Sequence, residues 1–137
     1  MLIDNFCLEY DHALKYKGEL LDLHNCYDFC NIVYDIQSQK IHLEWESNGN
    51  SVMLTSIFKF KLVFEEVFFF KIREREAELP FSLDTTLNTI GFLYTEDPDM
   101  DQPAFEVDNS RAMHMLLVFE SNMSLRLGAK SVKLINV

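Results

Sequence analysis

The sequence predicts a mainly β protein, built as an antiparallel β-sandwich or a partly closed β-barrel with one or two short helices. Three blocks in which apolar and polar residues alternate, at 41–46, 58–72 and 113–127, indicate this fold class. Because successive side chains of a strand point to opposite faces, such a block puts one face against a core and the other in water. Turn signals between the blocks predict about eight or nine strands in a single globular domain over residues 1–137.

The first quarter of the chain is expected to hold a short helix and then two strands. Asp11 is a candidate N-cap for a helix over 12–17, and Gly18 would end it. The segments 20–23 and 31–36 are rich in Leu, Ile, Val and Tyr, which favour strands.

Two turn signals surround the strand expected at 41–46. The polar residues 37–39 connect it to the preceding strand and predict a hairpin. Asn48-Gly49-Asn50 predicts a second turn, because Asn and Gly adopt positive φ at low cost. A short strand over 52–55 then leads into a Phe-rich block.

The Phe-rich block at 58–72 is interrupted by Glu65-Glu66. We expect a two-residue turn there, with a bulge in one bent strand as the alternative. Together with the facing strands, this block should supply the centre of the core. The side chains expected in the core are Trp45, Phe58, Phe60, Phe68, Phe70, Leu117, Phe119 and Leu125.

The residues after the Phe-rich block predict mixed local structure. The alternating charges of 73–76 fit either a solvated strand end or a short exposed helix. Ser82 or Asp84 is a candidate cap for one helical turn that reaches Asn88, and 91–94 has the composition of a strand.

The chain is expected to end in a hairpin and one short strand. Residues 113–119 and 123–127 each place apolar side chains at alternate positions, and Glu120-Ser121-Asn122 forms the turn between them. Gly128 breaks this pattern, and 132–135 supplies a last strand.

The composition indicates a protein with a sizeable core and an acidic surface. Hydrophobic residues make up 48% of the 137 residues, and the formal net charge is -10. A charge of this sign opposes binding to nucleic acid or to an anionic membrane, because both require clustered Lys and Arg. It suits solubility or a basic protein partner.

The basic residues concentrate within the Phe-rich block and just after it. They alternate there with glutamates, so we expect cross-strand ion pairs and not a phosphate-binding surface. These residues are Lys59, Lys61, Lys71, Arg73 and Arg75.

No segment predicts export or insertion into a bilayer. Residues 1–5 contain an acid and no basic residue, unlike a secretory signal, and no apolar run approaches the roughly 20 residues of a membrane span. Three cysteines, an odd number, do not suggest a disulfide framework. We therefore expect a soluble protein of the reducing cytoplasm.

His24, Cys26 and Cys30 are the weak candidates for metal ligands, because zinc prefers thiolate and imidazole. In an extended chain they and Asp28 would share one face. However, no second Cys or Cys–His pair follows to complete the site. Alternate strand residues are also about 6.5 to 7 Å apart, which hinders convergence on one ion. We expect no bound metal and no cofactor.

The sequence contains no catalytic motif that we identify. Cys26 and Cys30 lie among acidic residues, which work against thiolate formation. The chain has no Gly-x-Ser-x-Gly elbow, no His-Glu-x-x-His pair and no glycine-rich phosphate loop. We therefore expect a protein that is not an enzyme.

The irregular segment 95–110 is the main candidate for a binding site. It contains two prolines and six acids, and irregular segments of this length are usually functional or disordered. Its first acids alternate as in a calcium loop, but Gln102 stands where that loop requires glycine. We expect its acids to contact a protein partner. These residues are Glu96, Asp97, Asp99, Asp101, Glu106 and Asp108.

As a whole, the sequence predicts a non-catalytic protein-interaction module, for example an acidic inhibitor or immunity-type protein. In size and charge the chain is similar to small acidic bacterial proteins that neutralise toxins, a compositional likeness that transfers no residues. The alternative is a β-barrel or sandwich that holds a small apolar ligand, because alternation alone does not separate a filled core from a hollow one.

Overall fold

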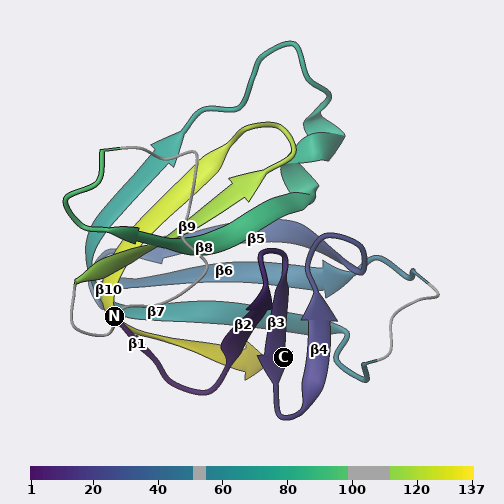
Figure 1. Cartoon of the computed structure of the whole chain (residues 1–137), viewed down its shortest axis with the longest axis horizontal. Helices are drawn as coiled ribbons and strands as arrows, with labels where there is room; N and C mark the ends of the chain where they lie inside the picture. Colours follow the sequence, from purple (N-terminus) through teal and green to yellow (C-terminus); the bar gives the residue numbers. More distant parts are fainter. Residues whose placement is uncertain (51–54, 99–111) are drawn as a thin grey trace.

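The computed structural model describes residues 1–50, 55–98 and 112–137. The mainly β fold class is confirmed, since the described residues form ten strands and one 3₁₀ turn (Figure 1). The elements are β1 Leu2–Ile3, β2 Cys7–Tyr10, β3 Ala13–Tyr16, β4 Glu19–Asp22, β5 Tyr27–Asp35, β6 Lys40–Ser47, β7 Lys59–Arg73, η1 Phe81–Thr85, β8 Leu87–Tyr94, β9 Met113–Phe119 and β10 Ser124–Asn136.

Seven strands form one sheet that curls into half a barrel (Figure 1). Its order is β5-β6-β7-β10-β9-β8, and the short β1 adds to β10 in parallel. Every other neighbouring pair is antiparallel. The alternation seen in the sequence sets the register, because apolar residues of neighbouring strands face each other. Trp45 lies opposite Phe60, for example.

The long strands β7 and β10 run through both halves of the curl and bend together. Before the bend, Phe64 and Val132 face each other and point inward; after it, Val67 and Ala129 do so. In both strands, the inward-pointing residues therefore switch between even and odd numbers at this bend. Glu66 lies at the bend with a φ of 52°, a left-handed conformation that is uncommon for residues other than glycine.

The smaller sheet, β2-β3-β4, packs against the concave side of the large one. Leu14, from its central strand, is fully buried and belongs to the same core cluster as Leu117 of β9. The backbone N–H of Ile90 also donates to the carbonyl of Asp11 at 2.6 Å. The two sheets thus share one core.

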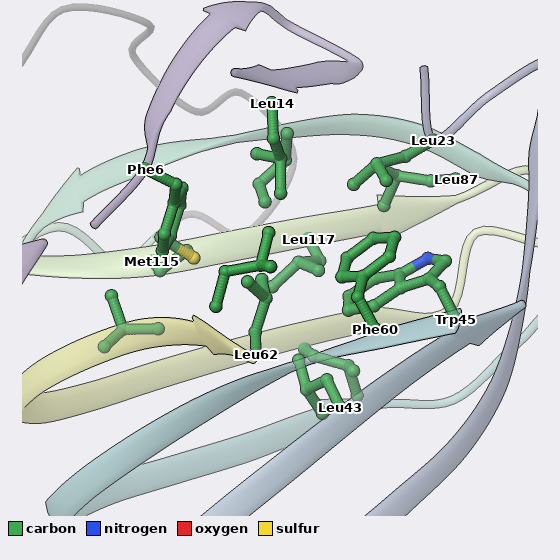
Figure 2. Close-up of a cluster of buried hydrophobic side chains, with 14 of the residues drawn as sticks. Phe6, Leu14, Leu23, Leu43, Trp45, Phe60, Leu62, Leu87, Met115 and Leu117 are labelled. Carbon is green, nitrogen blue, oxygen red and sulfur yellow. The ribbon is translucent and has the colours of Figure 1, made fainter. Parts of the chain in front are cut away.

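Several aromatic rings pack together within this core, and Figure 2 shows Phe60 beside Trp45. Trp45 stacks on Phe60 with ring centroids 5.4 Å apart, and Phe29 lies 4.9 Å from Trp45 and 4.8 Å from Phe119. Fully burying one side chain of this size contributes about 1.5–3 kcal/mol, so these rings carry a large share of the driving force for folding.

Several sequence-based expectations about elements are corrected. Residues 13–16 form β3 instead of a helix, because Leu14 and Tyr16 alternate into the core. Lys17 and Gly18, which follow this strand, both have positive φ and form the tight turn between β3 and β4. Glu65-Glu66 does not form a turn, since β7 continues through it as one bent strand, the alternative stated above.

The third correction concerns the residues after the Phe-rich block. In place of the helical turn expected to reach Asn88, the chain forms only the 3₁₀ turn η1, which follows Pro80 and has no side-chain cap. Strand β8 then begins at Leu87. Gly128 does not end a strand, because β10 runs unbroken past it. The predicted hairpins β5–β6 and β9–β10 are confirmed. Most of the strand expected at 52–55 lies outside the described residues.

Two of the expected core residues are also wrong. Phe58 is 69% exposed, because it precedes β7 and lies beyond the cover of the curled sheet. Phe68 is 67% exposed, because the register between β7 and β10 shifts at this residue. Phe70 is only partly buried. The fully buried members of the expected core are Trp45, Phe60, Leu117, Phe119 and Leu125.

Candidate functional site

The second half of β7 is paired on one side only. Residues 69–73 pair with β10 and Phe68 lies at the register shift, whereas the ladder between β6 and β7 ends where Ile41 faces Phe64. The last backbone contact on the β6 side is the bond from Val67 N–H to the carbonyl of Gln39, at 2.9 Å. Among residues 1–50, 55–98 and 112–137, no strand continues along this side. We call residues 68–73 the β7 edge.

Large apolar side chains are exposed at the β7 edge. Phe68 is 67% exposed and Ile72 is 51% exposed, although both lie within a strand. Tyr34, at the tip of the β5–β6 hairpin, is 47% exposed, and its ring centroid lies 6.0 Å from that of Phe70. The apolar surface therefore extends from the edge to the neighbouring hairpin tip.

The two faces of the β7 edge differ in chemistry. Phe70 and Ile72 pair with the core residues Leu127 and Leu125, so they lie on the inner face. Lys71 pairs with Arg126 and lies on the outer face, as do its alternate neighbours along the strand. In the part of the chain that the structure describes, Lys71 has no ion-pair partner. In contrast, Lys59 contacts Glu46 at 3.2 Å and Lys133 contacts Glu65 at 2.6 Å.

A buried polar pair supports the outer face beneath the β7 edge. The Nε of Arg126 donates to Nδ1 of His114 at 2.9 Å, and both side chains are only 4% exposed. Phe69 stacks on the His114 ring with centroids 4.4 Å apart. Burial, and then the adjacent Arg126 guanidinium, lower the pKa of His114 to about 4. The imidazole is therefore neutral at pH 7, with its proton on Nε2.

Arg126 also holds the start of the acidic segment that the sequence singles out. Its guanidinium donates to the carbonyls of Tyr94 and Asp97. The Asp97 carboxylate accepts a bond from the Tyr94 N–H at 3.2 Å, and the Glu96 carboxylate accepts one from the Thr95 hydroxyl at 3.4 Å. Asp97 thus has a local structural role. Of the other expected contact residues, Asp99, Asp101, Glu106 and Asp108 lie outside the described residues.

The candidate metal ligands do not share a face. Cys26 is buried in the core, whereas Cys30 lies at a register shift in β5 and donates to the carbonyl of Glu44 at 3.3 Å. His24 Nδ1 donates to the carbonyl of Leu87 at 2.7 Å. Within residues 1–50, 55–98 and 112–137, no three His, Cys, Asp or Glu side chains are grouped to hold an ion.

Neither of these thiols is activated. Desolvation raises the pKa of Cys26, and nearby Asp22 raises it further. Desolvation likewise raises the pKa of Cys30, with Glu46 adding to the effect. A raised pKa leaves less thiolate at neutral pH, which is the nucleophilic and metal-binding form.

Two histidines that the sequence does not connect lie together where the two sheets meet. The rings of His12 and His24 are edge to face with centroids 6.0 Å apart. Each Nδ1 already has an acceptor, the Asp11 carboxylate for His12 and the Leu87 carbonyl for His24, both at 2.7 Å. The His24 bond ties the segment after β4 to β8 of the large sheet, whereas the His12 bond stays within the β2–β3 turn.

A polar hollow of about 550 Å³ lies on the outer face, at the end of the β7 edge. Asn122 donates to the Glu76 carboxylate there at 2.7 Å. Its lining residues are Arg73, Glu74, Glu76, Asn88, Thr89, Val118 and Asn122. Acidic, amide and hydroxyl groups dominate this hollow, so it does not suit the apolar ligand that the sequence leaves as an alternative.

No protein-family model, curated protein or solved structure matches this chain. Its function is therefore argued from its own surface. None of the described residues forms a helix that is long and apolar enough to cross a bilayer.

The exposed β7 edge is not among the site residues expected from the sequence. The signal is present in Phe68-Phe69-Phe70, where apolar residues are consecutive instead of alternating. In a strand this places apolar side chains on both faces, and only one face can be covered by the core. The sequence pattern does not show, however, that β6 stops pairing with β7 before Phe68.

Proposed function

We propose that the protein is a non-catalytic protein-binding module and that its binding surface is the β7 edge. A single observation carries the proposal: among the described residues, β7 beyond Val67 pairs only with β10, and Phe68 and Ile72 are exposed there next to Tyr34. Soluble proteins normally shorten, charge or cover such an edge, because it invites pairing with another chain. An added strand would pair with the backbone on the open side of residues 68–72 and bury the apolar side chains.

The chemistry of the described residues supports a non-catalytic role. The thiols of Cys26 and Cys30 have raised pKa values, and the Nδ1 atoms of His12, His24 and His114 are engaged in hydrogen bonds. An acidic inhibitor with a basic partner remains a version of this proposal, in which the net charge of -10 would speed association. The close ring contacts in the core favour a protein-binding module over the apolar-ligand carrier.

Affinity capture from a lysate of the source cell tests the proposal. The bait proteins are the wild type, Ile72→Lys and Phe58→Lys. Both substitutions add a charge at an exposed apolar residue, but Phe58 lies before β7 and away from the edge. We expect a protein that the wild type and Phe58→Lys retain and that Ile72→Lys loses. Equal capture by all three baits would contradict the proposed surface, and a repeat at high salt measures the electrostatic contribution.

A further inference from the structure

We infer that the segment bound at the β7 edge is an extended strand in which apolar and acidic residues alternate. This inference rests on the proposed function and adds the chemistry of the partner. It follows from the two faces of the edge, because a strand that joins a sheet continues the alternation of its neighbour.

The inner face selects apolar residues. An added strand would place every second side chain next to Phe70 and Ile72, on the side from which Tyr34 also reaches the surface. Ile72 and Tyr34 are exposed and Phe70 is only partly buried, so covering them removes apolar area from water. A charged side chain in the same position would be desolvated without a partner.

The outer face selects acidic residues. Lys71 lies in the middle of the edge on this face, and it lacks an ion-pair partner among the residues that the structure describes. Opposite charges directly across a strand pair contribute favourably, and like charges oppose pairing. A carboxylate across from Lys71 would therefore supply the ion pair that Lys59 makes with Glu46 and that Lys133 makes with Glu65.

The length of the edge sets the length of the segment. Six residues of a strand span about 20 Å, so a partner segment of about six to nine residues covers it. A segment of this length offers about three positions to each face. That is enough for two or three apolar contacts and for one carboxylate next to Lys71.

A second copy of the chain is a poorer occupant. In an antiparallel pair related by a two-fold axis and centred on Lys71, that lysine would face itself; centred on Ile72, it would face the other copy's Arg73. A pair centred on Phe70 would place Phe69 across from Lys71, so it would supply no carboxylate to that lysine.

Binding of two designed peptides tests the inference. One blocked, dye-labelled nine-residue peptide alternates valine with glutamate, and the other alternates valine with lysine. We expect fluorescence anisotropy at about 0.15 M salt, where the net charge of -10 is largely screened, to show about tenfold tighter binding of the glutamate peptide. The variant Lys71→Glu should reverse this order. Lys61→Glu is the matched control, because Lys61 lies on the same strand where β6 occupies the edge, and it should keep the wild-type order.

The possible results separate the inference from the proposed function. An order that Lys71→Glu leaves unchanged overturns the role of charge at the edge. If neither peptide binds although Ile72→Lys still abolishes partner capture, the alternating chemistry is wrong and the binding surface stands.

A wild-type dimer in sedimentation that Ile72→Lys converts to monomer would show that a second copy occupies the edge, against the inference. Hydrogen exchange that slows at amides 68–73 when the glutamate peptide is added supports it.

Discussion

The contact between Arg126 and His114 shows how a β face opposite the core can bury polar residues. An unpaired guanidinium would be costly to desolvate, and His114 removes part of that cost by accepting its Nε–H at 2.9 Å. The carbonyls of Tyr94 and Asp97 accept further bonds. This arrangement requires the neutral imidazole, because a protonated ring cannot accept a bond at Nδ1.

The stability of the protein should therefore fall in weak acid. His114 has a pKa of about 4 in the folded protein, against an ordinary value near 6.5 in the unfolded chain. The unfolded chain binds the proton first, so stability is complete above about pH 6.5. It is lost as the pH falls to about 4, by up to roughly 3 kcal/mol. Urea unfolding at several pH values measures this loss.

His114→Gln is the control for this titration. The glutamine carbonyl can still accept from Arg126, but it does not titrate. We expect the difference in unfolding free energy between wild type and variant to change between pH 6.5 and 4. Taking this difference cancels the contribution of the carboxylates, which both proteins share. A constant difference across this range would show that the fold does not resist protonation of His114.

Gly128 is required by the packing of the same face. A Cβ at this position would lie 2.7 Å from atoms of both the His114 and Phe68 rings. Phe68 is exposed and can move, but His114 is fixed by Arg126. We expect Gly128→Ala to cost about 1–3 kcal/mol of unfolding free energy. Adding Phe68→Ala should recover little of this loss in urea unfolding, and full recovery would place the constraint on Phe68 instead.

At the scale of elements, β7 is one strand with two different environments. Its first half lies between β6 and β10, so the alternation of Phe60, Leu62 and Phe64 gives a buried face. Among the described residues, its second half has only β10 beside it, and the same kind of residue becomes exposed. The bend at Glu66 separates the two halves and lets β7 and β10 serve both sides of the curl.

Two phenylalanines of similar sequence context test this account of β7. Phe60 is fully buried, whereas Phe58, two positions earlier, is 69% exposed. Phe60→Ala should cost about 3–5 kcal/mol, because it loses the contact with Trp45 and leaves a cavity. Phe58→Ala should cost less than about 1 kcal/mol. Denaturant unfolding of both variants measures the difference, and equal losses would mean that the inward face is misassigned.

For the whole molecule, the shared core predicts that the two sheets fold as one unit. Leu14 and Leu21 of the smaller sheet are fully buried in the same cluster as Trp45 and Phe119. Loss of either sheet would expose the apolar face of the other. We expect a single domain with one cooperative transition.

Two probes, one in each sheet, measure this cooperativity. Trp45 fluorescence reports on the large sheet, and hydrogen exchange of the β3 amides reports on the small one. The free energies of opening should agree for both. Opening of β3 at much lower free energy than the Trp45 transition would show that the small sheet detaches on its own.

The sequence by itself determines the fold class, because strand alternation depends only on neighbouring residues. The hairpins β5–β6 and β9–β10 follow from local turn residues, and the inward positions of Trp45, Phe60 and Leu117 follow from the period of two. The helix expected at 12–17 fails for the opposite reason. Its residues have weak local preference, and packing of Leu14 and Tyr16 against a distant sheet decides that they form a strand.

The exposure of the β7 edge is decided only in the tertiary structure. Nothing local to Phe68, Lys71 or Ile72 shows that β6 ends before them, since this depends on the strand order and register of the whole sheet. The same holds for His114, whose alternating position gives no hint that it is buried against Arg126, twelve residues away. Pairing between distant segments determines which side chains are buried. The exposure of these side chains, their ion pairs and their pKa values all follow from that burial.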